Sequence, residues 1–341
     1  MLLLAGAMLS SCSMLVVGPG VPAPEARGSR VEAGAPESQD VPRFAFWWHV
    51  TGKEEVGAGA APAGTRTDVA FLYEHEAGEY PRVYEGREQY GGVPQRADIP
   101  AHLRELARDI QREIPDPNFS GLAVLDYESW EPVWSLTKPE YKEISRRLVR
   151  QNSPGRAEAD VERLAEANYE SAAKKFLLET INEARRQRPK AKWGFYAWPW
   201  PTYAGLRADK MQWMWDASDA IYPCLYAVKQ GVGPTQTAKA GQWEVARYMD
   251  DMRGRVALAK RAAGGKPVYA LLWVRYDFMS KEFGGQFLSE PDLAAALRVP
   301  REAGAAGAVF WNQSETRAEA ADLRRFVAER LVRALRDVQN P

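Results

Sequence analysis

The sequence has few cysteines and no excess of either charge. Its 341 residues include only two cysteines, Cys12 and Cys224, so the fold has no disulfide framework available to it. The 45 lysines and arginines are balanced by 45 aspartates and glutamates. This balance excludes the basic footprint of nucleic-acid binding and a polybasic membrane patch. An anionic ligand must therefore be bound by local charge rather than by the field of the whole molecule.

Motifs for several common chemistries are also missing. The three histidines, His49, His75 and His102, are scattered without metal-ligand spacing, so a zinc site is not expected. The chain contains no Gly-Lys-Ser/Thr loop that would cradle phosphate and no Gly-x-Ser-x-Gly elbow that would present a nucleophilic serine. We therefore expect neither a cofactor nor a nucleic-acid partner.

Long apolar runs are scarce, and none outside the N-terminus approaches the roughly 20 residues needed to span a bilayer. Residues 1–9 are apolar and lead into Ser10-Ser11-Cys12, which resembles the cleavage box of a bacterial lipoprotein signal. The usual basic residues are missing in front, so a frayed apolar N-terminus is the alternative. We expect residues 1–16 to direct export to the cell surface, with a lipid anchor on Cys12, or to secretion. The Gly-, Pro- and Ala-rich residues 17–41 are predicted to form a flexible tether.

Residues 42–341 alternate between apolar runs and amphipathic segments. Strands are predicted at 44–50, 69–73, 121–126, 192–196, 220–226, 267–274 and 307–311. Helices are predicted at 98–114, 137–149, 157–187, 210–217, 242–263, 290–297 and 316–336. Thr137 and Glu140 have the spacing of a capping box for the second of these helices. Such alternation indicates a parallel sheet covered by helices, so we predict one domain, a distorted TIM-like (β/α)7–8 barrel of the α/β class.

Several predicted strands end in polar or aromatic residues, which is where a barrel of this kind gathers its reactive groups. The aromatic content, with 12 Trp and 14 Tyr, suits sugar recognition as well as core filling, because pyranose rings pack on flat aromatic faces. The residues at the strand ends are Asp126 with Glu128, Tyr196, Tyr226 and Trp311.

Asp126 and Glu128 are the candidate catalytic residues. Because side chains alternate along a strand, the two acids should point the same way. Two carboxyl groups in one pocket raise the pKa of one of them, which keeps it protonated and able to act as an acid near neutral pH. The spacing alone leaves open a second interpretation, in which both are rim carboxylates bonded to arginines.

The segment around these acids resembles the active-site strand of glycoside hydrolase family 56, the hyaluronidase family. Residues 121–134 carry the similarity as Gly-Leu-Ala-Val-Leu-Asp-Tyr-Glu-Ser-Trp-Glu-Pro-Val-Trp. Further matching segments follow the same order, from residue 44 to residue 311: Gly91-Gly92-Val93-Pro94-Gln95, Arg188-Pro189 before Trp193-Gly194-Phe195-Tyr196, Trp213-Met214-Trp215, Tyr222-Pro223 with Tyr226, Phe287-Leu288-Ser289, and 307–311.

The resemblance implies a retaining hydrolase with substrate assistance, in which the acetamido oxygen of the sugar is the nucleophile. Glu128 would then be the acid and base, and Asp126 would stabilise the charge on the acetamido group. Tyr196, Tyr226 and Trp311 match residues that line the acetamido pocket, and Tyr73 matches a tyrosine near the cleavage point. Trp130 and Trp200 are further candidates for sugar contacts, with packing as the alternative. Arg275 is a candidate contact for a substrate carboxylate, with a structural ion pair as the alternative.

The sequence departs from the family at four positions. Glu131 stands where the family has arginine, Trp200 replaces an aspartate, Cys224 replaces a serine, and His49 stands where an asparagine is common. These changes leave open which polymer is bound, hyaluronan, chondroitin or another N-acetylhexosamine polymer. They also leave open a surface carbohydrate-binding protein with little or no activity. A family 18 chitinase is disfavoured, because Val124 and Gly121 stand where that family has acids.

Overall fold

The computed structural model of the protein describes residues 44–52, 61–197, 210–228, 245–278, 280, 283–314 and 316–339. The predicted export signal, Cys12, the tether and Trp200 lie outside these residues. Within them, no helix has the length and apolarity needed to cross a membrane.

Seven parallel strands among the described residues form a ring. Two sheets make it up, one in the order β2-β5-β6-β7 and one in the order β1-β9-β8. Backbone hydrogen bonds join them at both edges: Leu225 donates to the Leu271 carbonyl across 2.9 Å, and Arg66 donates to the Phe46 carbonyl across 2.8 Å. The strands are β1 (Ala45–Gly52), β2 (Val69–Tyr73), β5 (Leu122–Asp126), β6 (Lys192–Ala197), β7 (Tyr222–Pro223), β8 (Tyr269–Leu272) and β9 (Gly307–Ser314). The predicted TIM-like barrel is confirmed.

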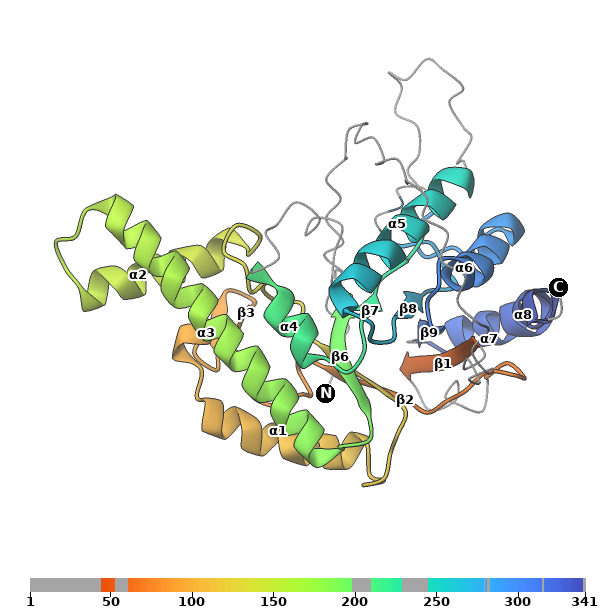
Figure 1. Cartoon of the computed structure of the whole chain (residues 1–341), viewed down its shortest axis with the longest axis horizontal. Coiled ribbons are helices and arrows are strands. Elements are labelled where there is room, and N and C mark those ends of the chain that lie inside the picture. Colours follow the sequence, from red (N-terminus) through yellow and green to blue (C-terminus); the bar gives the residue numbers. More distant parts are fainter. Residues whose placement is uncertain are drawn as a thin grey trace, which may run out of the picture.

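Helices cover the outside of the ring in two groups. Figure 1 shows α1 to α4 on one side of the strands and α5 to α8 on the other. The first group is α1 (Ile99–Glu113), α2 (Pro139–Asn152), α3 (Glu158–Gln187) and α4 (Gln212–Ala217). The second is α5 (Val245–Ala263), α6 (Glu290–Glu302), α7 (Arg317–Phe326), the π-helical turn η6 (Val327–Leu331) and α8 (Val332–Gln339).

Because side chains alternate along each strand, those that point into the ring form an inner core, and those that point outward form the cores beneath the helices. Along β5, Leu122 and Val124 pack inside the ring, whereas Ala123 and Leu125 pack outward against the first helix group. The other strands follow the same rule, so the residues just beyond their carboxyl ends continue the inward or outward direction that the strand sets.

Two local features differ from the sequence-based prediction. The prediction that Thr137 and Glu140 form a capping box is wrong, because the N-cap of α2 is Lys138, with Pro139 at the first helical position and no side-chain cap. The Thr137 hydroxyl is instead hydrogen-bonded to Tyr169 across 2.9 Å, because α3 packs over this turn. The short hairpin β3 (Arg82–Tyr84) and β4 (Arg87–Gln89), and the 3-10 turn η3 (Pro94–Arg96), were not predicted.

Glycine at position 194 allows the ring to close tightly on β6. A Cβ atom there would lie 2.3 Å from the Ala220 carbonyl oxygen and 2.8 Å from the Tyr222 ring. We expect Gly194→Ala to lower the free energy of unfolding by about 1–3 kcal/mol through overpacking. Gly254→Ala, at an open position in α5, is the matched control and should be neutral or stabilising. Urea unfolding of both variants measures the difference, and equal stabilities would contradict this account of the ring.

Candidate active site

The ends of the ring strands bring one set of side chains together. The side chains that point into the ring near these ends belong to one inner cluster or pack against it. They are Phe71 and Tyr73 on β2, Tyr196 on β6, Tyr226 after β7, Trp273 after β8 and Trp311 on β9. Asp126, at the end of β5, pairs in register with Tyr73. It continues the inward series of Leu122 and Val124, while its neighbour Tyr127 points outward and donates to the Ala77 carbonyl.

The two predicted acids contact each other. Asp126 is 6 % exposed and Glu128 is half-buried, and their side chains are hydrogen-bonded. The Oδ1 atom of Asp126 is buried and has no hydrogen-bond partner within the described part of the chain. Burial, together with the negative charge of Glu74, raises the pKa of Asp126 to about 8, although the hydrogen bond with Glu128 acts in the opposite direction.

A carboxyl pair in this state holds one proton near neutral pH. Because the two groups are hydrogen-bonded, the proton belongs to the pair rather than to either residue alone. The pair therefore has both partners needed for acid catalysis: one group that can donate a proton and one that can carry negative charge. The single unpartnered oxygen, Asp126 Oδ1, is an acceptor that a ligand N–H or O–H can satisfy.

Aromatic side chains surround this pair, and we call Tyr73, Tyr196, Tyr226, Trp273 and Trp311 the aromatic cluster. The Trp311 indole donates to the Tyr73 hydroxyl across 2.8 Å. Trp311 stacks on Tyr226 with ring centroids 6.2 Å apart, and Tyr226 is tilted against Tyr196 at 6.5 Å. The flat faces of these rings can pack on the apolar face of a sugar ring, while the tyrosine hydroxyls can hydrogen-bond to the sugar hydroxyls at its edge.

Burial keeps the hydroxyls of the cluster protonated. It raises the pKa of Tyr73, Tyr196 and Tyr226 far above neutral pH, so each can act as a donor. Behind Tyr73 lies His49, whose Nε2 is 3.3 Å from the Tyr73 hydroxyl. Burial lowers the pKa of His49 to about 4, so this imidazole is neutral and takes no part in the charge of the site near pH 7.

Glu74 is a third carboxylate at the site, and it was not among the residues predicted from the sequence. Its Oε2 accepts the backbone N–H groups of Glu128, at 3.0 Å, and Ser129, at 2.8 Å. Its Oε1 accepts from the Ser129 hydroxyl at 2.6 Å and from Arg82 Nη1 at 3.3 Å. Glu74 thus fixes the backbone that carries Glu128 and adds negative charge beside Asp126. Its position directly after Tyr73 at a strand end was a signal that could have identified it.

Trp273 was also missed, although it stands near the end of the predicted strand 267–274. It is 5 % exposed, and its ring lies 5.9 Å from that of Tyr226 and 5.7 Å from that of Trp311. Its indole nitrogen is buried without a hydrogen-bond partner among the described residues. Phe278, which is 59 % exposed, packs against it at 4.9 Å and continues the aromatic surface outward.

Two predicted sugar contacts lie elsewhere. Trp130 is 1 % exposed, stacks on Tyr80 in the outer core and donates its indole N–H to the Pro81 carbonyl, so packing accounts for it. Arg275 donates to the Gly285 carbonyl across 2.6 Å and lies 3.8 Å from the centre of the Phe287 ring. Phe287 in turn stacks on Phe326 of α7, so Arg275 faces the helical layer rather than the aromatic cluster.

The donor set does not favour a metal. Among the residues that the structure describes, no group of three or more His, Cys, Asp or Glu side chains is arranged to hold an ion. Cys224 belongs to no disulfide and is buried inside the ring.

Comparison with known proteins relates this arrangement to one family. A family model described as hyaluronidase matches residues 58–340. Human hyaluronidase-1 is 35% identical over 267 residues, which cover 72% of this chain and 58% of that protein. A chondroitin hydrolase of Caenorhabditis elegans is 37% identical over 176 residues, covering 46% of this chain and 38% of that protein. The chain thus spans just over half the length of human hyaluronidase-1.

Solved structures agree in fold. Bee venom hyaluronidase in complex with a hyaluronic acid tetramer superposes with a TM-score of 0.72 at 26% sequence identity. The superposition covers 87% of this chain and the whole of that structure.

Proposed function

The chain belongs to the hyaluronidase family, glycoside hydrolase family 56, and from that membership and the site geometry we propose that it hydrolyses a glycosaminoglycan, hyaluronan or chondroitin, at the bond that follows an N-acetylhexosamine. The observation that carries the proposal is the hydrogen-bonded Asp126–Glu128 pair, with its unpartnered Asp126 Oδ1, set against the aromatic cluster.

The first half-reaction uses the substrate's own acetamido group. Its N–H donates to Asp126 Oδ1, which stabilises the Asp126 anion and leaves the shared proton on Glu128. Glu128 then gives that proton to the glycosidic oxygen as the C–O bond breaks, and the acetamido oxygen forms a new bond to the anomeric carbon. The resulting oxazolinium ion is positively charged, and the Asp126 carboxylate lies where it can stabilise that charge.

The second half-reaction restores the enzyme. Glu128, now a carboxylate, takes a proton from water, and the hydroxide attacks the anomeric carbon from the side the leaving group left. The bond to the acetamido oxygen breaks, so the product keeps the configuration of the substrate. A protonated Tyr226 hydroxyl beside Asp126 is suited to donate to the acetamido oxygen as this bond breaks and the electron pair returns to that oxygen.

Purified protein incubated with hyaluronan, chondroitin, chondroitin sulfates and chitin tests the proposal. We expect new reducing ends from one of the first two polymers without any gain in ultraviolet absorbance. A gain in absorbance would indicate an unsaturated product and therefore a lyase, which would overturn the mechanism. Binding without new reducing ends would instead support a carbohydrate-binding protein.

Glu74 gives a prediction about pH. Its negative charge raises the pKa of Asp126, so removing that charge lowers the pH at which the pair loses its shared proton. We expect Glu74→Gln to move the alkaline limb of kcat/KM to lower pH. We also expect kcat to fall about tenfold, because a charged acceptor of two backbone N–H groups is lost. Glu76→Gln, in the same loop and 47 % exposed, is the control. An unmoved alkaline limb would contradict the electrostatic role of Glu74.

A further inference from the structure

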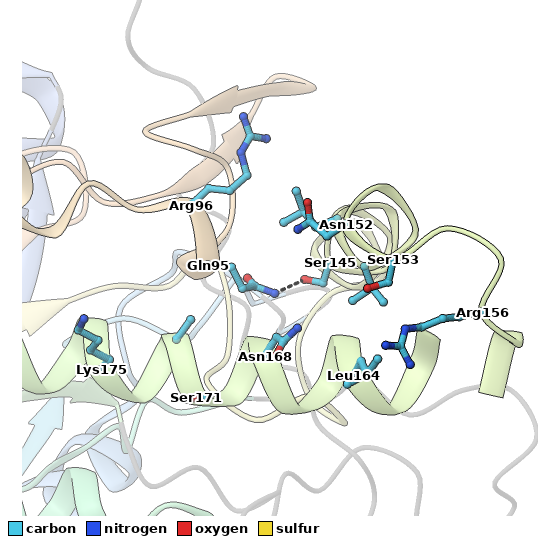
Figure 2. Close-up of a pocket in the computed structure, with 13 residues that line it drawn as sticks. Gln95, Arg96, Ser145, Asn152, Ser153, Arg156, Leu164, Asn168, Ser171 and Lys175 are labelled. Carbon is cyan, nitrogen blue, oxygen red and sulfur yellow. Dashed lines mark hydrogen bonds between the residues drawn. The ribbon is translucent and has the colours of Figure 1, made fainter. Parts of the chain in front are cut away.

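A groove lies outside the strand ring, between α2, α3 and η3 (Figure 2). Its volume is about 580 Å³, and none of its lining residues belongs to the carboxyl pair or the aromatic cluster. η3 contributes Gln95, which ends the Gly-Gly-Val-Pro-Gln segment that carries part of the family resemblance but has no place in the catalytic site.

Gln95 presents an unsatisfied acceptor in this groove. Its Nε2 donates to the Ser145 hydroxyl across 2.9 Å, and that hydroxyl donates to the Tyr141 carbonyl across 2.8 Å, so the amide is held in one orientation. The Gln95 Oε1 atom is buried and has no hydrogen-bond partner among the described residues. A buried acceptor without a partner is unfavourable, so a ligand that offers an O–H or N–H at this point gains binding energy.

The charge of the groove is positive. Figure 2 shows Lys175 on α3 at one end of the groove and Arg156, in the turn before α3, at the other end, with Asn168 and Ser171 between them. Lys175 and Arg156 are exposed, and neither has an ion-pair partner in the described part of the chain. Other cations nearby have ion-pair partners: Arg96 and Arg147 share Glu88, and Arg150 pairs with Glu158. None of the described residues that line the groove is acidic.

These features together define a ligand class. Two separated cations select a ligand with more than one negative charge, while the amides and hydroxyls between them select one rich in hydroxyl groups. On α3 the lining residues run from Leu164 to Lys175, which is about 16 Å along the helix axis. A groove of that length suits a segment of a chain better than a single small anion.

We propose that this groove binds a uronate-bearing oligosaccharide segment, with Arg156 and Lys175 on its carboxylates and Gln95 Oε1 accepting from a hydroxyl or acetamido N–H. The choice of an acidic saccharide rests on the proposed function, because the same polymer would then occupy the active site and this groove. The groove holds a distant part of the polymer and raises its local concentration at the catalytic pair.

The test uses the full chain carrying Glu128→Gln, so that binding is measured without cleavage. Titration calorimetry with a hyaluronan hexasaccharide should give two sites per chain. Adding Arg156→Gln and Lys175→Gln should remove one site or weaken it at least roughly tenfold, because two charge-assisted contacts are lost. Adding Arg108→Gln and Arg163→Gln, two exposed arginines outside the groove, is the charge-matched control and should change neither site.

Two further arms make the result decisive. Gln95→Leu keeps the charges and removes the acceptor, so it should weaken the same site severalfold. Inorganic phosphate at equal ionic strength should not compete with the hexasaccharide for the groove. Unchanged stoichiometry and affinity in the Arg156/Lys175 double variant would overturn the proposal, and so would phosphate binding as tight as that of the hexasaccharide. If the proposed activity alone were wrong, the groove variants would still remove a site although wild-type protein cleaved no polymer.

Discussion

Replacing Glu128 with glutamine should lower kcat for the cleaved polymer by about 10²–10⁴, the contribution expected of a positioned general acid. The amide has almost the same shape as the carboxyl group and can still hydrogen-bond to Asp126, so the arrangement seen in the structure is preserved. What the variant loses is the proton that the glycosidic oxygen needs as the bond breaks. Initial rates of reducing-end formation measure the loss, and unfolding curves show whether the fold is intact.

Two comparisons separate proton donation from a structural effect of this change. Glu179→Gln, on the exposed face of α3, makes the same substitution far from the strand ends and should retain wild-type activity. A substrate whose leaving group departs without protonation should lose much less rate in Glu128→Gln than the natural polymer does. Equal losses on both substrates, or wild-type activity on the polymer, would remove Glu128 from the acid role.

The barrel and its carboxyl pair were predictable from sequence because both depend on alternation. The seven apolar runs that predict the ring strands are short and are separated by amphipathic segments, and all seven appear in the ring. The same period of two puts Asp126 and Glu128 on one face, and the structure shows them hydrogen-bonded. The strands and the shared face of the two acids depend on the local geometry of the chain, which can be inferred from the order of the residues.

Features that depend on contacts between distant segments were not predictable in this way. Glu74 reaches Glu128 from a different strand, 54 residues earlier, and its partner Arg82 belongs to a hairpin whose apolar pattern is too short to recognise. Trp130 has the sequence setting of a sugar contact, yet the outer core occupies it, because the chain turns after Glu128 and the inward alternation ends. Tertiary packing decides such positions.

Asp126→Asn should inactivate the protein and stabilise it at the same time. Loss of the anion beside the positively charged intermediate should lower kcat by about 10²–10³, as for removal of one preorganised electrostatic group. Asparagine keeps an oxygen at the position of the carboxylate, so sugar affinity should change much less than kcat. The polymer assay used for Glu128→Gln measures both quantities.

The stabilising effect follows from the sign of the linkage between protonation and folding. Burial raises the pKa of Asp126 from 3.8 to about 8, so between these values the folded protein binds more protons than the unfolded chain. The free energy of unfolding contributed by this group therefore falls as pH rises from about 4 to about 8, and stays low above that. Asparagine does not titrate, so the variant escapes this loss.

The difference in stability between Asp126→Asn and wild type should accordingly be small near pH 4 and reach a few kcal/mol near pH 8. Comparing the two proteins at each pH cancels the buried histidines His49 and His102, whose lowered pKa values affect both chains equally. Thermal unfolding of both proteins at pH 4, 6 and 8 gives the trend. A variant that is less stable than wild type at pH 8 would mean that the folded protein stabilises the ionised form of Asp126. The carboxyl pair would then hold no shared proton at this pH, and the proposed acid catalysis by Glu128 would be contradicted.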